Sequence, residues 1–247
     1  MRGPILYLLL LISFLFFNFQ NKGVAAEWRI SPIRIVMVPQ DKSTSITVYN
    51  EDKIPINFQV KAMLWTQNDK GKDIYEETED IIFFPKIFTL QPGKERLIRI
   101  GLKNPTPLRE KSYRLYIEEI PSQPNKEGVA VQIALRFGIP IFVKPLKEET
   151  KWEITKKTVT NSTFILDIEN KGNHHFQVYY IKVKGYSGEK EILSKDIKGW
   201  YILSGSKRTF TEKIEDCEKI DKLTFQIISD RFTFDDKIDI NKEACNP

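Results

Sequence analysis

Two adjacent histidines and several paired carboxylates are the residues of this 247-residue chain best suited to acid–base or metal chemistry. Successive side chains of a strand point to opposite faces, so His174 and His175 cannot form one site together. Both follow a turn expected at Gly172. This position favours a solvated pair, and we expect no metal centre there.

The carboxylates give no clearer sign of catalysis. Adjacent acids such as Glu76-Glu77, Glu79-Asp80 and Glu118-Glu119 usually form a solvated face, and nothing marks one pair as an acid–base couple. The chain has no Gly-x-Ser-x-Gly elbow, no glycine-rich phosphate loop and no His-Glu-x-x-His motif. We therefore predict a protein that is not an enzyme and that uses no cofactor, metal ion or nucleotide.

The net charge of the chain argues against a nucleic-acid partner. Its formal net charge is only +5, which is well below what a nucleic-acid-binding protein usually carries. We expect no nucleic-acid partner.

Residues 1–26 have the pattern of a secretory signal peptide. Arg2 provides the positive start, an apolar run follows over residues 5–19, and Val24-Ala25-Ala26 offers small residues for cleavage. The alternative is a membrane anchor, which needs about 20 apolar residues, but polar residues from Asn18 onward shorten this run. We predict cleavage after Ala26, export to the bacterial periplasm and no stable membrane insertion of the mature chain.

Cys217 and Cys245 are the two cysteines of the chain, and no Cys-x-x-Cys motif is present. In an exported chain an even number of cysteines favours a disulfide over catalysis. Two free buried thiols remain the alternative.

The rest of the chain alternates apolar and polar residues with a period of two, interrupted by turn signals such as Gln91-Pro92-Gly93. About seven strands are expected before residue 145, which is typical of an immunoglobulin-like sandwich. A polar stretch over residues 145–150 separates this part from a second all-β part. We predict an all-β chain with a signal peptide at 1–26, one sandwich domain at 27–146 and another at 150–247.

The segment over residues 129–143 is predicted to be one unusually long strand. Its odd positions are all large and apolar, which gives an apolar row about 40 Å long at about 3.3 Å per residue. A core strand of a generic sandwich is the ordinary interpretation, but such strands usually have about 5–6 residues. Pro140 also removes a backbone donor, which favours an edge strand. A long apolar edge is suited to pairing with another chain.

Several segments in order resemble the first domain of the periplasmic chaperones of the chaperone–usher pilus pathway. They are Ser31-Pro-Ile-Arg34-Ile35, Val48-Tyr-Asn50 through Trp65, Phe84-Pro85 with Phe88 to Gly93, Arg109-Glu110-Lys-Ser112-Tyr through Pro121, and Val131-Gln-Ile133-Ala-Leu135. The resemblance implies two sandwiches in an L-shaped arrangement. It also implies that the chain holds pilus subunits and delivers them to an outer-membrane usher.

The implied mechanism is donor-strand complementation, in which the chaperone lends a strand to a subunit that lacks one. The residues expected to fill the subunit's groove are Val129, Val131, Ile133, Leu135 and Phe137. The family also anchors the subunit's terminal carboxylate with two basic residues. Arg34 matches the first position, whereas Pro140 stands where the family has a lysine. Arg99, Arg114 and Lys144 are the candidates for the second partner.

The departure at Pro140 makes the run over residues 136–143 resemble the archaic, spore-coat-protein-U-type branch of the family more closely. The alternative function is a structural or adhesive sandwich protein, of which a pilus subunit is the nearest form. A subunit would carry an N-terminal extension of alternating residues, whereas this chain has two domains with a long strand in the middle.

Overall fold

The computed structural model describes residues 27–103, 107–121 and 133–245, and within these ranges nearly all regular structure is β-strand. The predicted signal peptide, residues 1–26, lies outside the described residues. In the described part no helix is long and apolar enough to cross a membrane.

The N-terminal sandwich consists of two sheets packed face to face. One sheet has the order β1-β3-β8-β6, and the other has the order β2-β10-β9-β4-β5 with β7 also paired to β4. The strands are β1 (Trp28–Ser31), β2 (Ile35–Met37), β3 (Ser43–Asn50), β4 (Ile56–Gln67), β5 (Asp73–Glu77), β6 (Ile81–Phe84), β7 (Ile87–Leu90), β8 (Glu95–Leu102), β9 (Lys111–Ile120) and β10 (Arg136–Val143).

Alternation of side chains builds the core of this sandwich. In β4, Ile56, Phe58, Val60 and Ala62 are buried, and the residues between them are more exposed, as a period of two requires. The same period along β2, β3, β8, β9 and β10 supplies the other walls of one continuous apolar core.

The C-terminal sandwich has the same all-β character. Its sheets have the orders β11-β12-β16 and β14-β13-β17-β18, with the short β15 paired to β13. The elements are β11 (Trp152–Thr160), β12 (Thr163–Asn170), β13 (Phe176–Ser187), β14 (Lys190–Lys198), β15 (Tyr201–Ile202), β16 (Lys207–Lys213), β17 (Lys222–Ser229), β18 (Thr233–Asp239) and two 3-10 turns, η1 (Cys217–Lys219) and η2 (Lys242–Cys245). A separate buried cluster that includes Phe164, Phe176 and Phe225 fills it.

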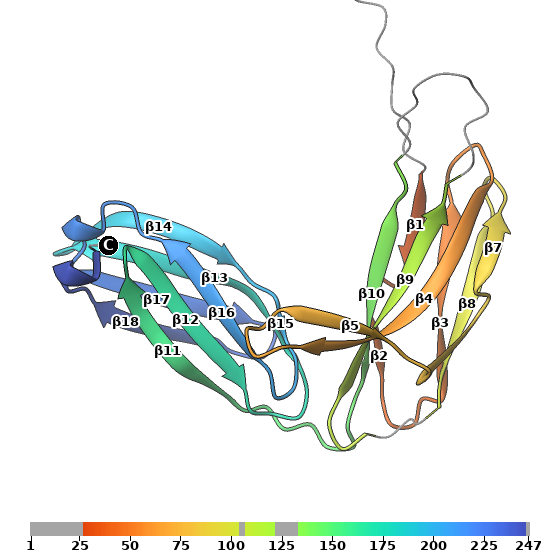
Figure 1. Cartoon of the computed structure of the whole chain (residues 1–247), viewed down its shortest axis with the longest axis horizontal. Helices are drawn as coiled ribbons and strands as arrows, with labels where there is room; N and C mark the ends of the chain where they lie inside the picture. The colour runs from red at the N-terminus through yellow and green to blue at the C-terminus, as the bar shows by residue number, and fades with distance from the viewer. Residues whose placement is uncertain (1–26, 104–106, 122–132, 246–247) are drawn as a thin grey trace, which may run out of the picture.

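The two sandwiches diverge from a shared junction, which gives the molecule the predicted L shape (Figure 1). A small buried cluster of Trp65, Phe142 and Leu203 lies at this junction and draws on both sandwiches. The prediction of two immunoglobulin-like sandwiches is therefore confirmed, and β10 runs along the side of the first sandwich that faces the second.

Candidate functional site

The two edges of β10 are occupied to different extents. One edge pairs antiparallel with β9 over the whole strand, from Arg136 to Val143. The other edge pairs in parallel with β2 only over Ile141–Val143. Among the described residues, the first part of β10 therefore has one edge without a strand partner. Pro140, which has no backbone N–H, is the last residue of this open part.

The apolar row predicted for β10 divides into a buried part and an exposed part. Ile139, Ile141 and Val143 belong to the core of the first sandwich, and Leu135 packs against that core while partly buried. The row therefore fills the chain's own core at its C-terminal end.

The N-terminal part of the row is more exposed. Ile133 is 55% exposed, and Phe137 is 44% exposed with its ring edge-on to Trp28 at 4.7 Å between centroids. The predicted strand over residues 129–143 is wrong in one respect, because β10 begins only at Arg136 and residues 133–135 have no regular structure. Within this segment, the carbonyl oxygen of Leu135 accepts the backbone N–H of Glu119 on β9 at 3.0 Å, and the regular pairing with β9 begins at Arg136. Val129 and Val131 lie outside the described residues.

Arg34 and Arg114 lie at the same level of the sheet that contains β10. Arg34 is exposed and directly precedes Ile35, which is in register with Ile141 of β10. Arg114 on β9 is in register with Pro140, the residue before Ile141. Ile35 and Ile141 point into the core. Successive side chains of a strand point to opposite faces, so Pro140 and its partner Arg114 point away from the core. Arg34 itself lies in the bend that leads into β2, beside the end of β2 that is nearest to Pro140.

The guanidinium of Arg114 is buried but only partly hydrogen-bonded. Its Nη1 donates to the carbonyl oxygen of Gly138 at 3.0 Å, and its central carbon lies 3.9 Å from the ring centroid of Trp65. Nε and Nη2 have no hydrogen-bond partner among the described residues. These two nitrogens form one edge of the guanidinium, and such an edge binds a carboxylate through two parallel hydrogen bonds.

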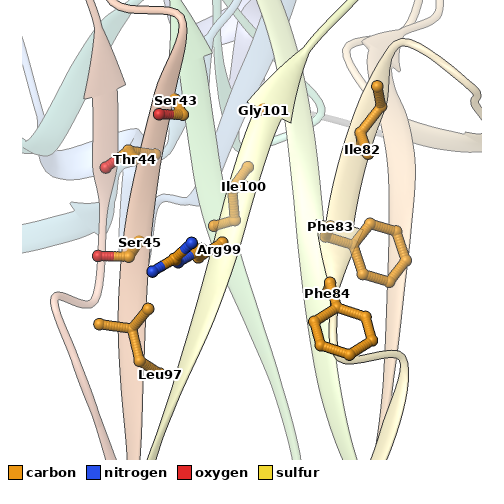
Figure 2. A pocket seen from close by; sticks show the side chains of 10 residues that line it. All are labelled: Ser43, Thr44, Ser45, Ile82, Phe83, Phe84, Leu97, Arg99, Ile100 and Gly101. Carbon is orange, nitrogen blue, oxygen red and sulfur yellow. The ribbon is translucent and has the colours of Figure 1, made fainter.

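The other two candidate anchors lie elsewhere or have a partner. Arg99 is on β8, in the other sheet of the first sandwich, where it lines a shallow depression of about 580 Å³ together with Ile82, Phe84 and Leu97 (Figure 2). Lys144 follows β10, but its Nζ lies 2.5 Å from Oε1 of Glu148. The structure therefore places Arg114 in the sheet that contains β10, Arg34 in the bend before β2 of that sheet, and Arg99 on the other sheet.

Comparison with known proteins agrees with this architecture. Residues 28–148 match the family model described as "Pili and flagellar-assembly chaperone, PapD N-terminal domain". The first sandwich belongs to this family. The resemblance found in the sequence is thereby confirmed over residues 28–148.

Individual members of the family are more distant. Chaperone protein FanE of Escherichia coli is 22% identical over 169 residues, which cover 66% of this chain and 70% of FanE. A chain of the CsuC–CsuE chaperone–tip adhesion subunit complex from the archaic Csu pili of Acinetobacter baumannii has a TM-score of 0.60 and 21% identity, with 86% of this chain and 98% of that chain covered. The E. coli chaperone DraB has a TM-score of 0.54 at 18% identity, with 87% and 98% covered. The solved structures support the fold across both sandwiches.

The junction between the two sandwiches contains a buried pair, His175 and Glu110, that the sequence did not predict. His175 is 4% exposed, and its Nδ1 lies 2.7 Å from Oε1 of Glu110, which also accepts the backbone N–H of His175 at 3.1 Å. The imidazole stacks on Phe142 at 3.6 Å between centroids. His174 is 2% exposed, and its Nε2 lies 2.9 Å from Oγ1 of Thr150.

The prediction of a solvated histidine pair is therefore wrong. A turn at Gly172 does place both residues at a loop, but that loop packs against the first sandwich. No local pattern could have revealed Glu110 as a partner, because it lies 65 residues away along the chain. The described residues contain no group of three or more side chains suited to holding a metal ion.

Cys217 and Cys245 form a disulfide, as the sequence predicted. The bond joins η1 to η2 at the C-terminal end of the described chain, next to the core of the second sandwich. It lies within one sandwich and so has a structural role there.

Proposed function

We propose that this family member is a periplasmic chaperone that binds and stabilises pilus subunits by donor-strand complementation and delivers them to an outer-membrane usher. The observation that carries the proposal is the open edge of β10, preceded by an exposed isoleucine that continues the apolar row. An open apolar edge is a hazard for a secreted protein unless another chain pairs with it. Strand addition supplies that partner.

The residues available to a subunit differ in what they would contribute. Ile133 and Phe137 are exposed enough to gain burial on binding, whereas Leu135 already contacts the chain's own core. Complete burial of one aliphatic or aromatic side chain contributes about 1.5–3 kcal/mol. The proposed donor segment also includes Val129 and Val131. Strand pairing would add a ladder along the edge of β10 that faces away from β9 and that β2 leaves open before Ile141.

We propose further that Arg34 and Arg114 together anchor the subunit's terminal carboxylate. Arg34 is exposed, so its guanidinium can contact the subunit's terminal carboxylate before Arg114 does. The unpaired Nε and Nη2 of Arg114 are buried next to Pro140, at the strand position where related chaperones carry a lysine, so a carboxylate would reach these two donors once neighbouring side chains such as Trp65 move. The absence of the lysine at Pro140 and the resemblance of residues 136–143 support placement in the archaic branch.

The known relatives support the choice of partner. CsuC is described in complex with a tip adhesion subunit, and the chaperone SafB of Salmonella enterica is described in complex with the pilin SafA. Binding by strand addition needs no nucleotide, cofactor or catalytic group. The alternative, a structural or adhesive sandwich protein, lacks a comparable supporting observation.

The test is capture of a subunit encoded in the same gene cluster by the co-expressed chain. Ile133→Asp places a charge in the proposed apolar interface, and we expect it to abolish co-purification of the subunit. Ala134→Asp is the matched control, because Ala134 is also exposed and faces the other way in an extended strand. Equal capture by both variants and the unaltered chain would rule out strand lending through this segment.

A further inference from the structure

The hairpin formed by β4 and β5 extends from the first sandwich towards the second. β4 is twelve residues long; β5 pairs with its last part, from Met63 to Gln67, whereas the pairing with β9 ends at Leu64. Figure 1 shows the tip of this hairpin beside β15 of the second sandwich. The hairpin is therefore placed to contact both halves of the molecule at a distance from the covalent linker over residues 144–151.

Gln67 makes a three-way contact at the end of β4. Its Nε2 donates to the carbonyl oxygen of Tyr201 at 2.9 Å, and its Oε1 accepts the backbone N–H of Leu203 at 3.0 Å. Nε2 also donates to Oδ1 of Asp73 at 2.9 Å, on the other strand of the hairpin. The amide thus pairs with two backbone groups of the second sandwich while its own strand fixes its orientation.

Two more hydrogen bonds surround this contact. Oδ2 of Asp73 accepts from the indole Nε1 of Trp200 at 2.8 Å, and the carbonyl oxygen of Gly71 accepts from Nη1 of Arg208 at 2.7 Å. Arg208 belongs to β16, so the hairpin reaches a second strand of the C-terminal sandwich. These bonds tie the hairpin to the segment over residues 200–203 and to Arg208 on β16.

Gly71 shows how closely the hairpin tip approaches its neighbour. Its φ is +74°, and a Cβ added there would lie 2.6 Å from the carbonyl oxygen of Lys207 and 2.8 Å from Cα of Arg208. Both are backbone atoms, which a small side-chain movement cannot displace. Glycine is therefore required here both by the backbone conformation and by the contact with the other sandwich.

We propose that the β4–β5 hairpin is a clamp that fixes the angle between the two sandwiches in the free chaperone. Interfaces between domains of one chain usually permit relative motion unless they are large and apolar. Here the apolar cluster at the junction contains only three fully buried side chains, so directional hydrogen bonds from the hairpin supply the missing restraint. If the proposed function holds, the clamp presents β10 and the second sandwich to a subunit as one preformed surface.

The test measures the distance between spin labels on the two sandwiches of the full mature chain, at the exposed positions Thr89→Cys and Lys237→Cys. We expect a single narrow distribution for the chain with glycine at position 71. Gly71→Ala should at least double its width. Gly93→Ala is the matched control, because Gly93 also has a positive φ, +66°, but open space around its Cβ position. It should leave the width unchanged.

Gln67→Glu gives a second, nearly isosteric variant in case Gly71→Ala fails to fold. It removes the donor to Tyr201 and places a carboxylate against Asp73, so the distribution should broaden as well. Its control is Gln226→Glu, because Gln226 also donates to an aspartate, Asp235, but within one sheet. Widths for Gly71→Ala and Gln67→Glu that match their controls would overturn the clamp.

The distance measurement requires no subunit, so it separates the clamp from the proposed function. A broadened distribution supports the clamp even if no subunit is captured by any variant. Loss of capture by Ile133→Asp with unchanged label distances supports the donor strand alone.

Discussion

Replacing His175 with alanine removes a ring from the buried junction between the two sandwiches. The ring lies 2.7 Å from a carboxyl oxygen of Glu110 and stacks on Phe142. The lost hydrogen bond costs about 1 kcal/mol. The lost ring pair costs about 1 kcal/mol more, and the cavity left at a site that is 4% exposed adds a comparable amount. We expect the free energy of unfolding to fall by about 3 kcal/mol.

Differential scanning calorimetry of the full mature chain measures this change. For a chain of this size each kcal/mol shifts the midpoint by about 2–4 °C, so His175→Ala should lower it by about 6–12 °C. A double-mutant cycle with Glu110→Gln isolates the contact between the sandwiches, and residues in contact usually show a coupling of at least about 0.5 kcal/mol. His174→Ala is the matched control, because its ring nitrogens bond to Thr150 and to a backbone carbonyl.

The double-mutant cycle between His174→Ala and Glu110→Gln should be additive. If the cycle between His175→Ala and Glu110→Gln is also additive to within about 0.3 kcal/mol, the buried pair does not link the sandwiches and the reasoning from its geometry is refuted.

Three further outcomes follow from the structure. Arg34→Ala should change the free energy of unfolding by less than about 0.5 kcal/mol, because the residue is exposed, yet lower subunit affinity at least tenfold in isothermal titration. The hydrogen bond from Lys111 lowers the pKa of Asp80, so Asp80 stabilises the fold at neutral pH and this contribution disappears as pH falls through the lowered pKa. Asp80→Asn should flatten the acid limb of stability measured by urea unfolding. Replacing Cys217 and Cys245 with serine should cost about 3.5 kcal/mol, given the sequence separation of 28, as measured by the unfolding midpoint of the second sandwich.

The sequence predicted the fold well where strands bury one face. The period of two from which the all-β fold was predicted is clear in β4 and β9, and both lie inside the first sandwich with their apolar face buried. It is weaker in β11 and β14. Both are at the edge of their sheets and carry lysines and glutamates at positions that face solvent. Edge strands are protected from aggregation by such charges, and the charges weaken the alternation that reveals a strand.

The candidate site was predictable only in part. Arg34 could be assigned because it matches a position of the family, whereas the second partner could not be chosen among Arg99, Arg114 and Lys144. That choice depends on which strands are neighbours, and β9 lies beside β10 while β8 belongs to the other sheet. Contacts such as Gln67 with Tyr201 join residues 134 positions apart, and no local pattern encodes them.

The sequence predicted the apolar row that ends in β10, but it did not predict which part of the row is buried in the chain's own core. Ile139, Ile141 and Val143 fill the chain's own core, and Ile133, on the same side of an extended chain, stays exposed. A residue that fills the chain's own core and a residue that would fill a partner's core are both apolar, and both recur at every second position of a strand. Only the pairing of the neighbouring strands separates them, because β2 joins the edge of β10 at Ile141 and leaves it open before that point. Pro140 lies at this change, where a missing N–H costs no ladder bond to β2, so the sequence does carry one local sign of where the chain's own core gives way to the proposed subunit groove.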